Sequence, residues 1–269
     1  MTVRVLDGFT GTGSIRKVCE QLGWECITVD IDKQFNPTHL CDMLDFDYKQ
    51  YPKDYFDIIW ASPDCRFYSK LQNTWIGRRK KDGIMTTRET IEENRKNSDK
   101  LIYKCWEIID YFNPHYWFLE NPLSTLKDRE VMKDKPYYIV DYCKYCDWGY
   151  RKRTCIWTNK KDFKPLICNK DCENMIYIDN QKLHSERMGT SKTIEDNGKI
   201  IRVNTAELRK KYKDYPNIQN KHKIDLSIDS IKKYNKKHNI DVSKSIGGGT
   251  NREERYRIPP NLIYSLLLD

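Results

Sequence analysis

The chain opens with Val3-Arg4-Val5-Leu6-Asp7-Gly8-Phe9-Thr10-Gly11-Thr12-Gly13-Ser14, and this stretch decides the fold that we expect. An apolar strand runs into a glycine-rich turn, and apolar residues at helical spacing follow from Ile15 to Leu22. Such a turn lets backbone N–H groups approach a ligand, with the positive end of the helix behind them. The stretch predicts a cofactor pocket in an α/β fold, although glycines also form ordinary tight turns.

A second short strand is predicted over Cys26-Ile27-Thr28-Val29-Asp30. It ends in a carboxylate at about the distance where dinucleotide-type folds hold a ribose. Asp30 is therefore the expected ribose ligand, and the alternative is a solvated loop aspartate.

A third apolar run, from Phe56 to Ala61, leads into Ser62-Pro63-Asp64-Cys65. Cys65 would stand at the carboxyl edge of the sheet, where α/β folds place reacting groups. It is a candidate nucleophile, and the alternative is an inert structural thiol. Downstream, helical spacing predicts a scaffold helix from Thr90 to Phe112, ended by Asn113-Pro114.

Several motifs occur together in the order seen in cytosine 5-methyltransferases. They are Asp7-Gly8-Phe9-Thr10-Gly11-Thr12-Gly13, Asp30-Ile31-Asp32, Cys41-Asp42, Ser62-Pro63-Asp64-Cys65, Phe118-Leu119-Glu120-Asn121-Pro122, Arg151-Lys152-Arg153 and Arg257-Ile258-Pro259-Pro260-Asn261-Leu262. The chain resembles this family over residues 1 to about 160 and 246–269, and most closely its short phage and large-virus branch, which has Glu-Asn-Pro. The resemblance implies a doubly wound, Rossmann-like S-adenosylmethionine methyltransferase fold with a small inserted target-recognition domain.

The resemblance also implies methylation of cytosine carbon 5 in double-stranded DNA. That carbon is a poor nucleophile, so a thiolate must first add to carbon 6, and Cys65 would supply it. Glu120, after the apolar strand Tyr116-Trp117-Phe118-Leu119, would hold or deliver the compensating proton at ring nitrogen 3. Arg153, or Arg151 two residues earlier on the same strand face, would orient the base or its phosphate. The target base would be flipped out of the duplex.

The same resemblance implies the residues around S-adenosylmethionine. Phe9 and Ile31 would pack near the adenine, Asp30 would hold the ribose, and Asp42 would bind the adenine amino group. The remaining expected cofactor-binding residues are Asp7, Thr10, Gly11, Thr12, Gly13, Ser62 and Pro63.

The chain departs from the family pattern in three places. Asp64 replaces the second proline of Pro-Pro-Cys and puts a carboxylate beside the thiol, Trp148-Gly149-Tyr150 precedes the arginine motif, and Pro122 replaces valine. A tRNA cytosine 5-methyltransferase and a catalytically degenerate nucleic-acid-binding homologue stay open as alternatives. An amino-group methyltransferase is disfavoured, because that class has an aromatic residue where Cys65 stands.

Length and composition agree with a soluble enzyme, which we expect inside a cell, and the resemblance makes this the cytoplasm or a host nucleus. The 269 residues contain no apolar run near 18 residues and no signal-peptide pattern, and the 10 cysteines are expected to be reduced. The formal charge of +9 favours a polyanionic partner and no membrane partner. The sequence carries no prediction of the oligomeric state.

The predicted organisation is a catalytic and cofactor-binding domain over residues 1–159, a basic target-recognition region over 160–245, and a segment over 246–269 that returns to the first domain. The basic loop from Trp75 to Gly83 is expected to close over a flipped nucleotide or to be an ordinary solvated loop. Asp225–Lys236 is a surface helix on DNA or a solvated face.

Four cysteines form a possible zinc site, written Cys143-x2-Cys146 and Cys168-x3-Cys172, with His184 twelve residues beyond. One feature argues against zinc. Cys143 and Cys146 lie in or near the predicted strand from Tyr138 to Tyr142, and the alternating side chains of a strand constrain the ligand geometry.

Overall fold

The structure is a computed structural model that describes residues 2–79, 83–178, 181–185, 191–196, 199–204 and 256–268. These residues fall into two compact units. The first comprises Met1–Val140, Arg153–Leu166 and Ile258–Asp269, and the second Asp141–Lys152 and Ile167–Arg257. Lys80, Lys81, the basic runs between 205 and 245, the segment Asp225–Lys236 and the glycines at 247–249 lie outside the described residues.

The first unit is built on a seven-stranded sheet of order β3-β2-β1-β4-β5-β7-β6. β1 pairs in parallel with β2 and β4, and β5 in parallel with β4, whereas β7 runs antiparallel to β5. The strands are β1 (Arg4–Gly8), β2 (Glu25–Asp30), β3 (His39–Leu40), β4 (Ile58–Ala61), β5 (Tyr116–Pro122), β6 (Tyr137–Asp141) and β7 (Arg153–Thr158). The strands predicted from the sequence are all present, so the expected Rossmann-like α/β class is confirmed.

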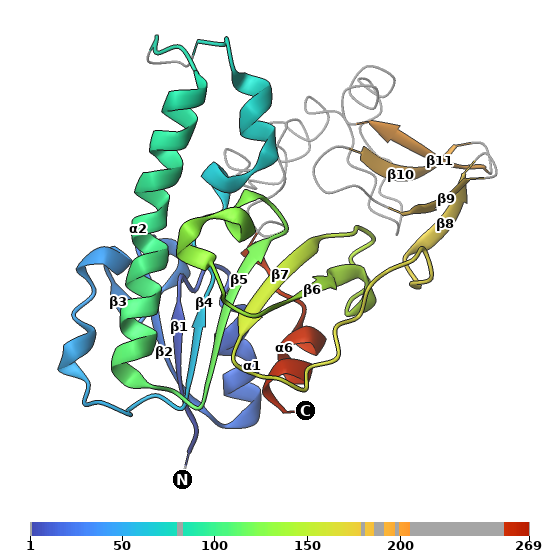
Figure 1. The fold of residues 1–269 in the computed structure, drawn as a ribbon. Helices are drawn as coiled ribbons and strands as arrows, with labels where there is room; N and C mark the ends of the chain where they lie inside the picture. The colour runs from blue at the N-terminus through green and yellow to red at the C-terminus, as the bar shows by residue number, and fades with distance from the viewer. Residues whose placement is uncertain are drawn as a thin grey trace, which may run out of the picture. The chain divides into compact units, whose positions relative to one another are not determined.

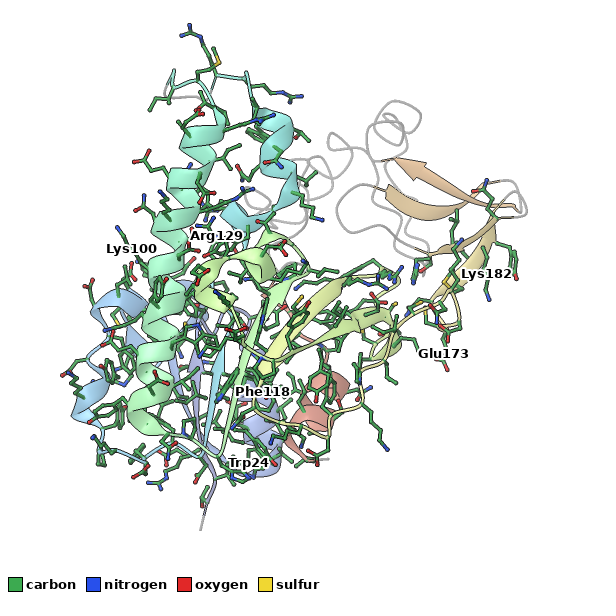
Figure 2. The ribbon with its side chains drawn as sticks, in the orientation of Figure 1. Trp24, Lys100, Phe118, Arg129, Glu173 and Lys182 are labelled. Carbon is green, nitrogen blue, oxygen red and sulfur yellow. The ribbon has the colours of Figure 1, made fainter. Side chains whose placement is uncertain are left out.

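Three α-helices accompany this sheet: α1 (Ser14–Leu22), α2 (Arg88–Phe112) and α6 (Pro260–Leu267). In Figure 1, α2 crosses the near side of the sheet, and α1 and α6 lie together behind it. Successive residues of β5 point to opposite faces of the sheet. Leu119 belongs to the core beneath α2, while Phe118 stacks on Trp60 of the neighbouring strand, with ring centroids 5.1 Å apart. Figure 2 shows Phe118 within the sheet and Lys100 on the outer side of α2.

Helix α2 begins at Arg88, two residues before the predicted start. Thr87 and Thr90 form a reciprocal cap, in which the Thr90 backbone N–H donates to the Thr87 hydroxyl and the Thr87 N–H to the Thr90 hydroxyl. The helix ends where the sequence predicts, because Asn113 adopts the left-handed conformation with φ of 47°. Among the described residues, no helix has both the length and the apolarity needed to span a membrane.

The 3-10 helices of the first unit are mostly single turns that connect strands. They are η1 (Lys33–Phe35), η2 (Met43–Asp45), η3 (Tyr48–Gln50), η4 (Arg66–Tyr68), η5 (Lys70–Trp75), η6 (Thr125–Asp128) and η7 (Glu130–Met132). The end of the chain belongs to this unit: the Ile258 N–H donates to the Ser14 hydroxyl at 3.0 Å, and α6 contacts α1.

The described part of the second unit carries η8 (Tyr142–Lys144) and two antiparallel hairpins. The hairpins are β8 (Met175–Ile178) with β9 (Gln181–His184), and β10 (Ser191–Asp196) with β11 (Lys199–Asn204).

Candidate active site

The predicted nucleophile lies just beyond the end of β4. The strand stops at Ala61, and the Ser62 N–H donates to the Gly8 carbonyl at 3.2 Å, which fixes the start of the loop against β1. Cys65 is half-buried and caps the 3-10 turn η4, where its carbonyl accepts the Tyr68 N–H at 3.2 Å. The thiol therefore stands at the carboxyl edge of the sheet, as the sequence predicts.

The Glu-Asn-Pro motif is joined directly to this loop. Glu120 and Asn121 lie in β5 and are 6% and 0% exposed. The Asn121 amide donates to the Pro63 carbonyl at 2.9 Å, in a buried bond between residues 58 positions apart. Asn121 therefore ties the strand that carries Glu120 to the loop that carries Cys65.

The antiparallel strand β7 brings Arg153 to the same edge. Pro122 is paired with Thr154, and the next step is the Leu123 N–H donating to the Arg153 carbonyl at 3.0 Å. The first unit thus collects Cys65, Glu120 and Arg153 from three neighbouring strands of one sheet.

The structure separates the two arginines that the sequence left equivalent. β7 begins at Arg153, so Arg151 is not on the strand, and the expected shared strand face is wrong. Arg151 instead donates two parallel bonds, of 2.9 and 2.8 Å, to the fully buried carboxylate of Asp141. The Arg151 guanidinium is thus held in a bidentate pair with a structural partner.

The unusual Asp64 also has a partner. One carboxylate oxygen accepts the Arg66 backbone N–H at 2.8 Å, and the other lies 2.9 Å from the Arg66 guanidinium. The negative charge expected beside the thiol is therefore offset by a neighbouring cation.

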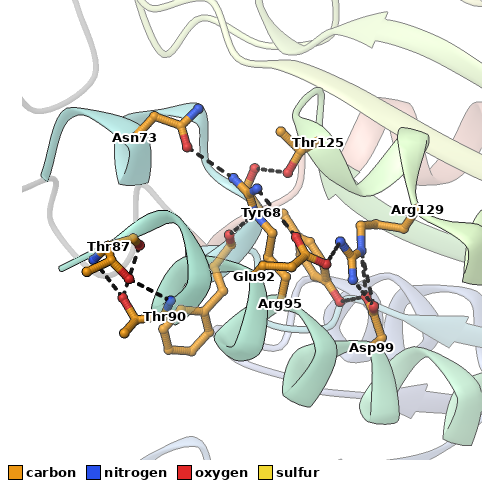
Figure 3. A network of polar contacts seen from close by, with 10 residues as sticks. Tyr68, Asn73, Thr87, Thr90, Glu92, Arg95, Asp99, Thr125 and Arg129 are labelled. Carbon is orange, nitrogen blue, oxygen red and sulfur yellow. Dashed lines mark hydrogen bonds and ion pairs between the residues drawn. The ribbon is translucent and has the colours of Figure 1, made fainter. Parts of the chain in front are cut away.

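A buried polar network holds the segment after Cys65 against α2 (Figure 3). The Tyr68 hydroxyl donates to Asp99 at 2.9 Å, and Asp99 in turn pairs with Arg129. The Thr125 hydroxyl donates to the Tyr68 carbonyl at 2.7 Å, and Arg95 donates to the Phe67 carbonyl at 3.2 Å. Sequence reasoning missed this network. Its signal was Asp99, a carboxylate on the apolar stripe of the predicted helix.

The glycine turn after β1 is anchored to β2. Phe9, with φ of 64°, and Thr10 both donate their N–H groups to the Val29 carbonyl, at 2.9 and 3.1 Å. Gly13 caps α1 with φ of 69°, a conformation that favours glycine. The Gly11 N–H donates to Asp30 at 2.9 Å, so the predicted ribose ligand already contacts the turn.

Asp7 is the buried carboxyl of this turn. It is 2% exposed and accepts the Thr10 hydroxyl at 2.6 Å. Burial raises the pKa of Asp7 to about 7, because removal from water disfavours the charged form more than the Thr10 bond favours it.

Other expected cofactor residues lie in the turn itself and in the loops that follow β2 and β3. The hydroxyls of Thr12 and Ser14 lie 3.2 Å apart. Ile31 is 69% exposed directly after Asp30, and so offers an apolar side chain to a ring. Asp42 accepts the Leu44 N–H at 2.9 Å and thereby begins its own 3-10 turn.

Unpaired polar atoms gather near Glu120. Among the described residues, four buried side-chain oxygens have no hydrogen-bond partner. Three of the four belong to Asn121 and Thr154, in the paired ends of β5 and β7, and to Ser124, two residues after β5. Buried polar groups are normally satisfied, so this end of the sheet suits a polar ligand.

The predicted zinc ligands need one correction. Cys143, Cys168, Cys172 and His184 form a group of potential metal ligands, whereas Cys146 lies outside it. The Cys146 thiol donates to the Tyr142 carbonyl at 3.1 Å instead. The strand ends at Asp141 and Cys143 lies in the 3-10 turn η8, so strand alternation does not constrain these ligands as expected.

The sheet order and glycine turn, with a cysteine loop after β4, define a Rossmann-like α/β fold. No family model matches the chain. A relative described as "Probable DNA (cytosine-5)-methyltransferase", from Frog virus 3 (isolate Goorha), is 42% identical over 178 residues, which are 64% of this chain and 79% of the relative. The chain belongs to the DNA (cytosine-5)-methyltransferase family.

A solved structure of the S. pombe Dnmt2 methyltransferase is also similar. It has a TM-score of 0.38 and 13% identity, and the similarity covers 64% of this chain. The chain spans about half the length of that structure, 53% of it.

Proposed function

We propose that this protein transfers a methyl group from S-adenosylmethionine to carbon 5 of cytosine in double-stranded DNA. One observation carries the proposal: the buried bond from Asn121 to the Pro63 carbonyl joins the Glu120 strand to the Cys65 loop at 2.9 Å. The description of the viral relative as a probable DNA (cytosine-5)-methyltransferase supports DNA as the substrate.

Cys65 would begin the reaction as a thiolate. Its sulfur forms a bond to carbon 6 of the pyrimidine, and the electron pair of the 5,6 double bond moves toward carbon 5 and the ring. Glu120 would hydrogen-bond ring nitrogen 3 and supply the compensating proton there. Arg153 would hold the base or its phosphate with its planar donor fork.

S-adenosylmethionine supplies an electrophilic methyl group when bound. Carbon 5, activated by Cys65, would take that methyl group as the methyl–sulfur bond of the sulfonium breaks and leaves a neutral thioether. Loss of the carbon 5 proton to a base and cleavage of the bond from Cys65 to carbon 6 then restore the aromatic ring.

The residues around the glycine turn fit such a cofactor. Gly11 and Gly13, with φ of 49° and 69°, keep the backbone of the turn free of side chains. Asp30 offers a carboxylate for ribose hydroxyls, and Ile31 an exposed apolar side chain for the adenine. Asp42 would bind the adenine amino group.

The target base must leave the duplex, because the thiolate attacks from above the ring plane and stacking covers that face. The loop that begins at Trp75 would cover the flipped base. Its two described ends are joined by backbone bonds, since the Gly77 N–H donates to the Thr86 carbonyl and the Thr86 N–H to the Arg78 carbonyl, both at 2.9 Å. Trp75 is 53% exposed beside these basic residues, and aromatic side chains with cations suit a nucleotide.

A duplex oligonucleotide with 5-fluorocytosine tests the proposal. Fluorine at carbon 5 cannot leave as a proton does, so the wild-type protein should form a stable covalent complex in the presence of S-adenosylmethionine. Cys65→Ser should form none, whereas Cys146→Ser, which alters another half-buried thiol, should form it as the wild type does. Equal trapping by Cys65→Ser would overturn the assignment.

Substrate competition separates the alternatives. Labelled methyl recovered only in tRNA would assign the protein to RNA modification. Cofactor and DNA binding without methyl transfer, unaffected by Cys65→Ala, would mark a degenerate homologue.

A further inference from the structure

Three cysteine sulfurs and one imidazole nitrogen lie close together in the second unit. Cys143 comes from η8, Cys168 and Cys172 from the turn before β8, and His184 is the last residue of β9. The four ligand atoms all lie within 4.8 Å of one another. His184 Nε2 lies 3.3, 3.5 and 3.4 Å from the sulfurs of Cys143, Cys168 and Cys172.

Hydrogen bonding alone does not explain this arrangement. One imidazole nitrogen carries either one proton or one lone pair, so it bonds well to one thiol at a time. Here three sulfurs are nearly equidistant from the same nitrogen. The sulfurs also lie within 4.8 Å of one another, so the four ligand atoms form the kind of close group that surrounds an ion.

The distances match a tetrahedral zinc site. With zinc–sulfur and zinc–nitrogen bonds of about 2.3 and 2.0 Å, tetrahedral angles separate the sulfur and nitrogen ligands by about 3.5 Å. The observed separations of 3.3 to 3.5 Å agree with that edge. Four protein ligands leave no open position, which is typical of a structural ion.

The surroundings also favour a bound ion. The three cysteines are 3%, 2% and 9% exposed and none is in a disulfide. Within the described part of the chain, this cluster has Met175 as its one partly buried apolar neighbour, and a cluster of this size contributes little hydrophobic stabilisation. Small modules commonly rely on a metal.

We infer that Cys143, Cys168, Cys172 and His184 bind one structural Zn²⁺, which fastens the segment 167–185 to the segment 141–152. Hydrogen bonds of Asn174 also join these two segments. The Asn174 amide donates to the carbonyls of Cys143 and Cys146, at 3.0 and 2.7 Å, and its oxygen accepts the Gly149 N–H at 2.9 Å.

The ion would also fix the position of Arg151. The Cys168 N–H donates to Asp141 at 2.9 Å, and the same buried carboxylate holds Arg151. Backbone groups next to ligating residues commonly complete such an outer shell. Zinc thus orders the peptide that leads into the Arg151-Lys152-Arg153 motif without contacting a substrate.

Metal content of the full chain tests the inference, independently of methyl transfer. The protein purified without added metal should contain about one zinc ion per chain by elemental analysis, and Cys143→Ser and His184→Ala should lose it. His184→Cys should keep it, because four thiolates also bind zinc, and this variant guards against a folding defect in His184→Ala. Cys146→Ser is the matched control and should keep the full content.

A second measurement uses Co²⁺. The apo chain prepared with a chelator should take up one Co²⁺ and show the intense visible absorption of a tetrahedral thiolate site, and zinc should remove that spectrum. Wild-type protein that binds neither metal, or a disulfide among these cysteines in its place, would overturn the inference. Loss of zinc from Cys146→Ser equal to that from Cys143→Ser would overturn the ligand set.

Discussion

The bond from Tyr68 to Asp99 offers a sharp test of how the loop after Cys65 is held. Tyr68 is 0% exposed and donates to Asp99 at 2.9 Å, so Tyr68→Phe removes a buried bond to a charged acceptor. Such bonds contribute about 1.5 to 3 kcal/mol. In this variant Asp99 still accepts a bond from the guanidinium of Arg129 at 3.1 Å. The buried carboxylate therefore keeps a charged partner, and the lower end of this energy range applies. We expect a loss of about 1.5 kcal/mol in the free energy of unfolding.

Thermal unfolding followed by the helical circular dichroism signal measures the effect. For a chain of this size the loss corresponds to a midpoint about 3 to 6 °C lower. Tyr103→Phe is the control, because Tyr103 lies on the same helix α2 and is 57% exposed, and it should leave the midpoint unchanged. If Tyr68→Phe behaves like Tyr103→Phe, the network does not hold this loop.

Two further predictions concern charged groups. Arg151→Ala should cost about 2 kcal/mol of stability in urea unfolding, since it deprives buried Asp141 of two bonds while Arg151 itself is about a third exposed. Arg153→Ala should instead lower methyl transfer at least about tenfold. The reverse pattern would exchange their roles. Burial raises the pKa of Asp7 from 3.8 to about 7, so between these pH values the folded state binds more protons than the unfolded state. The contribution of Asp7 to the free energy of unfolding therefore falls as pH rises through that window. Asp7→Asn should therefore gain stability relative to wild type from pH 5 to about pH 7 and level off above it; a difference that does not change with pH would show that Asp7 is charged throughout.

The sequence was sufficient for most strands of the sheet in the first unit, but not for the two-residue strand β3. The predicted strands are short apolar runs bounded by polar or glycine residues. Helix α2 was predictable to within two residues, because Asn113-Pro114 ends it and only the Thr87 cap was overlooked. These features depend on neighbours in sequence.

Features that depend on distant contacts were not predictable. Arg151 and Arg153 are equivalent by spacing, and only the buried carboxylate of Asp141 separates them. The Cys-x2-Cys spacing from Cys143 predicts Cys146 as a metal ligand, whereas His184 lies far from Cys143 in the sequence. The hairpin β8–β9 brings His184 opposite Met175, and that pairing places its ring among the three sulfurs.

Methyl transfer from labelled S-adenosylmethionine to duplex DNA, with the modified nucleoside identified by mass spectrometry, tests the central claim most directly. The account predicts 5-methylcytosine from the wild-type protein and none from Cys65→Ser. Methylated DNA whose label lies on another base or atom, or equal 5-methylcytosine from Cys65→Ser, would contradict it.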